Sequence, residues 1–212
     1  MLDLHKLPLF FAASIILLLT PGPAVIYIVT RSVSQGRLAG LVSVMSIETG
    51  NLFHALAAAL GLSALLLSSA LAFTAVKYLG AAYLIYLGLR KLFAHESSSG
   101  QVELAPQSLR RVFSQGVLVA ILNPKTALFF VAFLPQFVDP AQGAAAPQLL
   151  ELGCLFVLMA VVSDSLYALL AGSLAGRFKS RPAFGSLSRY LTGGVYIGLG
   201  ITAALAYGGR HS

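Results

Sequence analysis

Long apolar runs separated by short polar stretches dominate the chain. A transmembrane helix requires about 20 mostly apolar residues, and six runs meet this length: Leu7–Val29, Leu41–Leu67, Ala70–Leu92, Phe113–Phe137, Leu149–Leu174 and Tyr190–Tyr207. The stretches between them are too short to form a separate soluble domain. The pattern therefore predicts an all-α integral membrane protein with six transmembrane helices in one transporter domain, residues 1–212.

Two of these runs carry helix-breaking residues near their middle. Pro21 and Pro23 flank Gly22 in the first run, and the sequence Asn123-Pro124-Lys125 interrupts the fourth. Proline removes a backbone donor and clashes with the preceding turn, so each helix should bend or break there. Backbone groups freed at membrane depth must be satisfied by protein or by water in a cavity. We therefore expect a substrate site where the two breaks meet.

A weak internal repeat divides the chain into two halves. The segment Val76–Leu89 aligns with Ser188–Ile201 at a constant offset of 112 residues (188 − 76), although chance similarity between two apolar helices is the alternative. The halves are residues 1–93 and 113–207, and the Ser-, Gly- and Pro-containing stretch 94–112 is the linker. Three helices in each half predict two inverted three-helix repeats, because an odd number of spans reverses the orientation of the second half.

Composition and charge agree with membrane insertion. Hydrophobic residues make up 58% of the chain and charged residues 10%, against about 25% charged in soluble domains. The net charge of +7 does not indicate nucleic-acid binding, because the basic residues lie in short loops, as membrane orientation requires. Ten of the fourteen fall in the first, central and last of these loops: Arg31, Arg37, Arg90, Lys91, Arg110, Arg111, Arg177, Lys179, Arg181 and Arg189.

This charge bias places the three basic loops in the cytoplasm and both termini outside it. A re-entrant helix in place of one span would reverse the N-terminus. The single Cys154 excludes an intramolecular disulfide, and the four scattered histidines form no metal-ligand cluster. The sequence therefore predicts no cofactor and no metal, and it leaves a homo-oligomer open.

Three ionisable residues interrupt the apolar runs, and such residues are costly inside a membrane. From the helical rise of about 1.5 Å per residue, Glu48, Pro21, Asp164 and Lys125 lie roughly 10, 12, 15 and 18 Å from the cytoplasmic edge. They therefore share one slab near the midplane. Asn51 lies on the same side of its helix as Glu48. Two structural alternatives stand beside a functional one: Glu48 at a helix end, and Asp164 paired with Lys125 as a structural ion pair.

Four segments together resemble the LysE/RhtB family of bacterial amino-acid exporters. They are PGP at Pro21–Pro23, GNLFHALAAALGLSALL from Gly50, KYLGAAYLIYLGLRKL from Lys77 and NPKTALFFVAFLPQF from Asn123. The resemblance implies a small inner-membrane exporter of amino acids driven by the proton gradient, with Pro21, Gly22, Pro23, Asn123, Pro124 and Lys125 as motif positions. One departure is Ser46, where many relatives have glycine, and it bears on helix packing.

The leading hypothesis is amino-acid export by proton antiport with alternating access, in the bacterial inner membrane. Backbone N–H groups at the breaks, assisted by Lys125, would bind the substrate carboxylate. Glu48 or Asp164 would receive the ammonium group or the coupling proton. The alternatives are a membrane-embedded metal-ion exporter or redox carrier, and a membrane enzyme acting on lipid. These alternatives are disfavoured because the chain has only one cysteine, no His- or Asp-rich loop and no catalytic spacing of acids. We therefore do not expect an enzyme.

Overall fold

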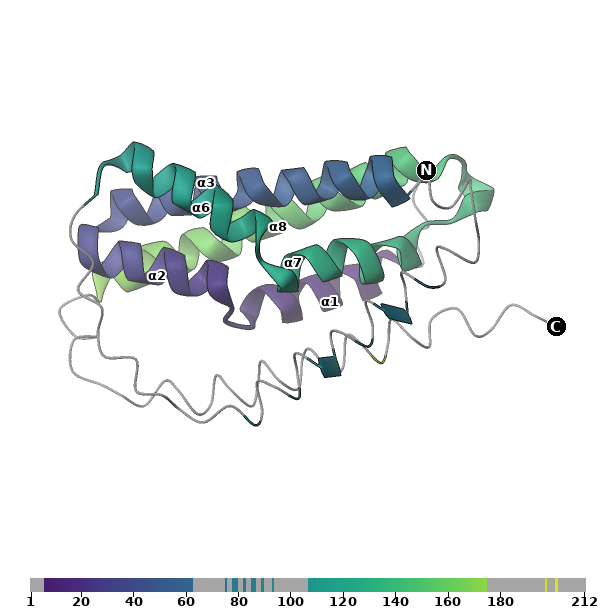
Figure 1. The fold of residues 1–212 in the computed structure, drawn as a ribbon, viewed down its shortest axis with the longest axis horizontal. Helices are drawn as coiled ribbons and strands as arrows, with labels where there is room; N and C mark the ends of the chain where they lie inside the picture. The colour runs from purple at the N-terminus through teal and green to yellow at the C-terminus, as the bar shows by residue number, and fades with distance from the viewer. Residues whose placement is uncertain are drawn as a thin grey trace.

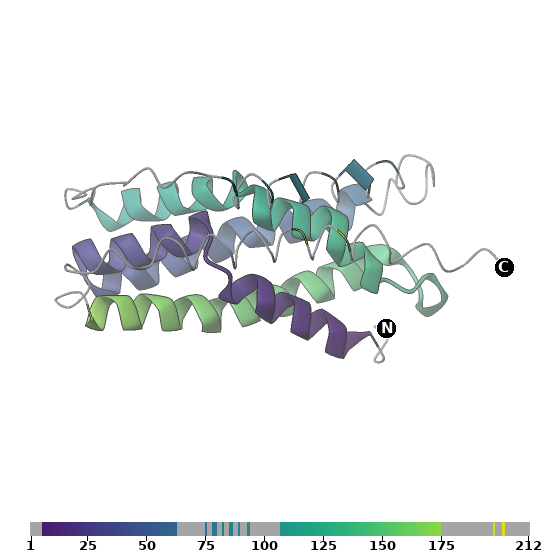
Figure 2. The same ribbon diagram turned by 90° about the horizontal axis from the view of Figure 1, so that it is seen from below.

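The computed structural model describes residues 6–62 and 107–174, together with isolated residues between 75 and 93 and at 197 and 201. Its α-helices in these ranges are α1 (Leu7–Leu19), α2 (Pro23–Gln35), α3 (Arg37–Ala57), α6 (Leu109–Ile121), α7 (Pro124–Leu128) and α8 (Ala145–Ser173). Short π-helical and 3₁₀ segments follow α3 and α7: η1 (Ala58–Leu62), η2 (Phe129–Phe133), η3 (Leu134–Phe137) and η4 (Pro140–Gln142). The helices lie along one long axis (Figures 1 and 2). The all-α class is confirmed for this part of the chain.

The bundle is apolar outside and partly polar inside. On α8, Leu158, Val162, Leu166 and Leu170 are exposed at four-residue steps along one face, whereas Asp164 on the same helix is buried. The buried polar and charged side chains are Ser14, Thr20, Arg31, Ser32, Ser43, Ser46, Glu48, Asn51, Asn123, Lys125, Thr126, Gln148 and Asp164. Water would favour the reverse arrangement, so this surface is suited to lipid.

Helix length supports the same conclusion. With 29 residues, α8 is roughly 44 Å long at about 1.5 Å per residue, which exceeds the hydrocarbon thickness of about 30 Å. In the described part of the chain, α8 alone is long and apolar enough to span a bilayer. The pairs α1 with α2 and α6 with the segment Pro124–Phe137 would add up to two further spans if each bent pair is one span.

Both predicted breaks are present, and they divide spans that the sequence analysis drew as single runs. The run Leu7–Val29 is two helices, α1 and α2, which meet at 50°. The run Phe113–Phe137 is likewise divided after α6, with a bend of 44°. The two broken segments run antiparallel, because α2 contacts the first half of α6 while the end of α1 contacts α7. Their breaks therefore meet in the middle of the bundle (Figure 1).

The first predicted loop is much shorter than expected. Arg31 lies inside α2 and is buried, and only Gly36 separates α2 from α3, which begins at Arg37. Gly36 has φ of +88°, a left-handed conformation that favours glycine. The placement of Arg31 in a loop was therefore wrong. Similarly, α6 begins at Leu109, so residues 109–112 of the predicted linker are helical.

Close contacts between small residues bring α3 against its neighbours. A Cβ at Gly50 would meet Ala120 of α6, and one at Gly153 of α8 would meet Ala55. At Gly40 of α3 an added Cβ would meet Ser32 of α2. Helices in membranes associate through such small residues, because no hydrophobic driving force acts between them in lipid. These contacts place α3 at the centre, against α2, α6 and α8.

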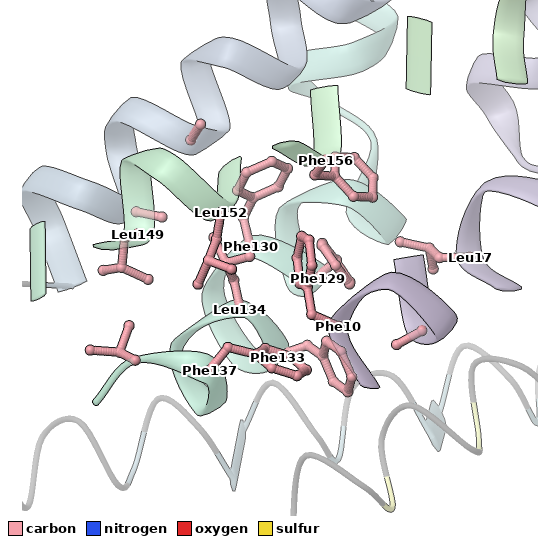
Figure 3. Close-up of a cluster of buried hydrophobic side chains, with 14 of the residues drawn as sticks. Phe10, Leu17, Phe129, Phe130, Phe133, Leu134, Phe137, Leu149, Leu152 and Phe156 are labelled. Carbon is pink, nitrogen blue, oxygen red and sulfur yellow. The ribbon is translucent and has the colours of Figure 1, made fainter. Parts of the chain in front are cut away.

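A cluster of phenylalanines fills the half of the bundle that contains α1 and η2 (Figure 3). Phe129 contacts Phe156 with ring centroids 4.7 Å apart, and Phe133 with centroids 5.3 Å apart. Phe10 packs edge to face on Phe137 at 5.4 Å. We call this group the aromatic cluster; its phenylalanines are Phe10, Phe129, Phe130, Phe133, Phe137 and Phe156. Of these phenylalanines, Phe156 also borders the space between the breaks.

Several sequence predictions fall outside the described residues. These are the third and sixth spans, Ala70–Leu92 and Tyr190–Tyr207, most of both repeat segments, and the two termini. The inverted repeat and the orientation therefore remain predictions.

Candidate functional site: a polar cavity between two helix breaks

The break between α1 and α2 follows directly from its two prolines. A residue before proline is restricted to extended conformations, and both Thr20 (ψ 116°) and Gly22 (ψ −173°) adopt them. Pro23 then occupies the first position of α2, where its missing N–H is harmless. Ala24 and Val25 follow in the first turn of α2, so their amide N–H groups have no acceptor within the helix.

The carbonyl groups freed at the end of α1 are satisfied by side chains. The Lys125 Nζ donates to the carbonyl oxygens of Leu17 (2.6 Å) and Thr20 (2.5 Å). The Tyr167 hydroxyl donates to the Leu19 carbonyl at 3.1 Å, and the Thr20 hydroxyl donates to the Ile16 carbonyl at 2.6 Å. A cation at a helix C-terminus is also favoured by the helix dipole. Lys125 therefore joins the second break to the first.

The break between α6 and α7 is built by a helix cap. Asn123 is the N-cap of α7, and its Oδ1 accepts the Lys125 backbone N–H at 3.1 Å. Its Nδ2 donates to the Thr126 hydroxyl at 3.0 Å. Pro124 again fills the first helical position. This cap directs the Lys125 side chain towards α1.

A small cavity lies between the two breaks. Its lining residues come from α1, α2, α3, α7, α8 and the breaks: Leu17, Leu18, Gly22, Ala24, Val25, Ile47, Asn51, Asn123, Lys125, Thr126, Phe156 and Asp164. Its volume is about 30 Å³, measured as the space open to the centre of a water molecule. A water needs about 10–15 Å³ on this measure, so the cavity would hold about two. It must widen before it can admit a larger solute.

Two carboxyl groups meet beside this cavity. Glu48, in the middle of α3, and Asp164 of α8 are both buried, and they lie close enough to interact electrostatically. Asn51 Nδ2 donates to Glu48 Oε2 at 2.9 Å. Glu48 Oε1 and Asn51 Oδ1 are buried without any hydrogen-bond donor. Since two adjacent ionised carboxylates repel strongly in a low-dielectric interior, the pair is expected to hold one proton.

The structure brings most of the predicted site residues together. Gly22, Asn51, Asn123, Lys125 and Asp164 line the cavity, and Glu48 lies next to it. Pro21, Pro23 and Pro124 shape the breaks but do not line the cavity. The position of Glu48 inside α3 removes the helix-end alternative. Among the described residues Lys125 forms no direct salt bridge with Asp164; its ammonium instead binds the α1 carbonyls, close enough to Asp164 to attract it electrostatically.

Sequence reasoning missed Thr20 and Thr126. Thr20 is buried, and its carbonyl accepts from Lys125, while Thr126 completes the Asn123 cap. Both residues lie next to a proline motif in the sequence, and this position could have identified them. Ser46, the departure noted in the sequence, is buried and packs against Gly116 of α6, where an added Cβ would collide with it. The glycine that permits close packing is thus on the opposite helix, and α3 and α6 still approach closely.

An apolar outer surface, buried charges and two broken helices around a polar cavity define a membrane transport protein. Comparison with protein families matches residues 15–207 to the LysE type translocators. The chain belongs to this family, and it is therefore a membrane-embedded transporter and not an enzyme. The predicted family is confirmed.

Similar bacterial proteins support this assignment. An uncharacterized membrane protein of Bacillus subtilis (strain 168) is 31% identical, over 96% of this chain and all of its own length. The homoserine/homoserine lactone efflux protein of Salmonella typhimurium is 34% identical over 84% of this chain and 89% of its own. The leucine efflux protein of the same species is 30% identical over 61% and 62%. No solved structure gives a significant match.

Proposed function

We propose that the protein exports amino acids, or close derivatives, from the bacterial cytoplasm across the inner membrane in exchange for protons. The family and the names of two relatives, which describe efflux of homoserine, its lactone and leucine, support amino-acid export. They also disfavour the alternatives of a metal-ion exporter or redox carrier. The proposal includes six spans in two inverted repeats, with both termini outside the cytoplasm.

The observation that carries the proposal is the convergence of opposite charges at the cavity. Lys125, Ala24 and Val25 line the cavity, and the substrate carboxylate would bind the Lys125 ammonium and the free amides of Ala24 and Val25. Asp164 and Asn51 also line it, and the ammonium group would bind Asp164 and the unpartnered Asn51 Oδ1. A zwitterion needs both kinds of group in one cavity. Aliphatic side chains of Leu17, Val25 and Ile47 would contact the substrate side chain.

Proton coupling follows from the two carboxyl groups. When the pair of Glu48 and Asp164 holds one proton, a single negative charge remains, and the two carboxyl groups share it. An arriving ammonium group favours the fully ionised pair and so displaces the proton. Departure of the substrate on the outside lets a proton return. Each cycle therefore exchanges one proton for one amino acid at the same two acids.

Alternating access explains the small size of the cavity. In this form Phe156 of the aromatic cluster lines the cavity, and hydrogen bonds join α2 to α6, including the one that Tyr27 Oη donates to the Val112 carbonyl at 2.6 Å. With room for about two waters, the cavity corresponds to a closed state. Opening at one end at a time would require the two broken segments to move relative to each other.

An export assay tests the proposal. Bacteria expressing the chain are loaded with homoserine and with dipeptides that release single amino acids, and the amino acids in the medium are measured over time. We expect faster release of at least one of them than from cells with an empty vector. Asp164→Asn, at equal membrane levels, is the matched control and should lose accumulation against a gradient. Release no faster than the empty vector for homoserine and all twenty amino acids would overturn the proposal.

A further inference from the structure

A buried arginine lies at the other end of α2, outside the cavity. Arg31 is 3% exposed, and each of its hydrogen-bonding partners is neutral. Its Nη1 donates to Gln35 Oε1 at 3.0 Å, and its Nη2 donates to Gln107 Oε1 (3.1 Å) and Gln115 Oε1 (2.9 Å). The guanidinium also lies over the Tyr27 ring, 5.5 Å from its centroid. Arg31 Nε is buried and has no acceptor.

This arrangement is unusual because a buried charge normally has a partner of opposite charge. The acids in the described part of the chain are Glu48, Asp139, Glu151 and Asp164, and none of them bonds to Arg31. Among the described residues, the other charged side chains near this end are basic: Arg37 begins α3, and Arg110 and Arg111 lie in the first turn of α6. Amide oxygens carry only partial charge, so the guanidinium keeps much of its capacity to bind an anion.

We propose that Arg31 is a carboxylate-binding residue at the cytoplasmic entrance to the cavity. The α-carboxylate of the amino acid binds Nε and Nη2 of the guanidinium in a bidentate manner and displaces the amide oxygen of Gln115 from Nη2. Because Gln115 belongs to α6, its displacement loosens the contact between α2 and α6 that closes this end. The direction of transport and the identity of the anion rest on the proposed function; the anion site itself does not.

The position of Arg31 on α2 suits this role. Arg31 follows Gly22 by nine residues, which is roughly 13 Å along the helix at about 1.5 Å per residue. An amino acid is too short to contact both places at once. It would therefore bind first at Arg31 and then at the break, where Lys125 and the α2 amides receive the same carboxylate. The basic residues of this end raise the local concentration of anions before binding.

A binding experiment separates this site from the cavity. The purified full-length protein in neutral detergent is heated with 4-methylpentanoate, which has a carboxylate but no ammonium group, or with the uncharged 4-methylpentanamide. At ten times the Kd, binding to the folded form should raise the unfolding midpoint by about 3–6 °C. We expect this rise with the carboxylate and none with the amide. Arg31→Gln should abolish it, whereas Arg110→Gln, at an exposed arginine, should retain it.

Gln115→Glu keeps the inference testable if Arg31→Gln does not fold. The new carboxylate would form an intramolecular ion pair with the Arg31 guanidinium. In the absence of ligand the variant should therefore be more stable than the wild type, and 4-methylpentanoate should not stabilise it further. An equal ligand response in Arg31→Gln or Gln115→Glu and in the wild type would overturn the assignment. So would stabilisation through Arg31 by phosphatidylglycerol but not by the carboxylate, since the site would then bind a lipid phosphate. Failure here alongside successful export refutes only this inference.

Discussion

Replacing Lys125 by methionine tests whether this ammonium group holds the two breaks together. Methionine preserves much of the side-chain volume but leaves the Thr20 carbonyl without a donor, whereas the Leu17 carbonyl loses Lys125 and keeps the Thr20 N–H at 3.1 Å. An unsatisfied buried polar group costs about 1–3 kcal/mol and a lost hydrogen bond from a charged donor about 1.5–3 kcal/mol, so the two carbonyls together cost about 2.5–6 kcal/mol. Removing the ammonium also relieves its own desolvation, which offsets part of this cost. From these two opposing contributions we expect a net loss of about 3 kcal/mol.

For a chain of this size, 1 kcal/mol shifts the unfolding midpoint by about 2–4 °C, so Lys125→Met should lower it by about 6–12 °C. The chain has no tryptophan, and the measurement is therefore the fraction of monodisperse protein that survives heating in detergent, followed by size-exclusion chromatography. Arg110→Met removes an exposed charge from α6 and should shift the midpoint by less than about 2 °C. A Lys125→Met midpoint within 2 °C of the wild type would refute the idea that Lys125 joins the breaks.

Three further predictions concern coupling, the breaks and orientation. Asp164→Asn should retain expression and some substrate binding but lose proton-driven accumulation outside the cell, with Glu48→Gln as the comparison; wild-type rates and pH dependence in both variants would contradict the antiport mechanism. Pro21→Ala and Pro124→Ala should each reduce transport more than membrane insertion, because they restore a backbone donor and let the helices continue; normal transport at equal protein levels would mean that the breaks only bend the helices. A reporter that is active only in the cytoplasm should be inactive when fused at Ser212 and active when fused in the central loop. The opposite result would exclude the predicted orientation.

The sequence predicted the positions of both breaks because proline acts locally. Pro21, Pro23 and Pro124 constrain their own turns whatever surrounds them. It also placed Glu48, Asp164 and Lys125 at similar depth, since helical rise is nearly constant. The partners of these side chains depend on helix rotation and packing, which one sequence does not specify. For this reason the expected pairing of Lys125 with Asp164 was replaced by bonds to α1 carbonyls, and Glu48 was found against Asp164.

Arg31 shows a different limit of sequence reasoning. A basic residue at the end of an apolar run normally marks a cytoplasmic loop, and the hydropathy pattern gave no reason to extend the helix beyond it. The structure continues α2 to Gln35 because Gln107 and Gln115, more than 70 positions later in the chain, supply acceptors for the guanidinium. Such a long-range hydrogen-bond network has no signature in local periodicity.

The distribution of unsatisfied polar atoms connects the two sites. In the described residues, four buried side-chain atoms have no hydrogen-bond partner: Ser14 Oγ, Arg31 Nε, Glu48 Oε1 and Asn51 Oδ1. The other buried side-chain polar atoms of the described residues have partners, as around Gln148, whose amide nitrogen donates to the carbonyls of Asp139 and Gly143. An atom left unsatisfied costs about 1–3 kcal/mol, so the closed form is destabilised at these points. A ligand can shift a conformational equilibrium only through its differential affinity for the two states. A carboxylate at Arg31 and an ammonium group at Asn51 and Glu48 would each supply what the closed form lacks, and a zwitterion carries both.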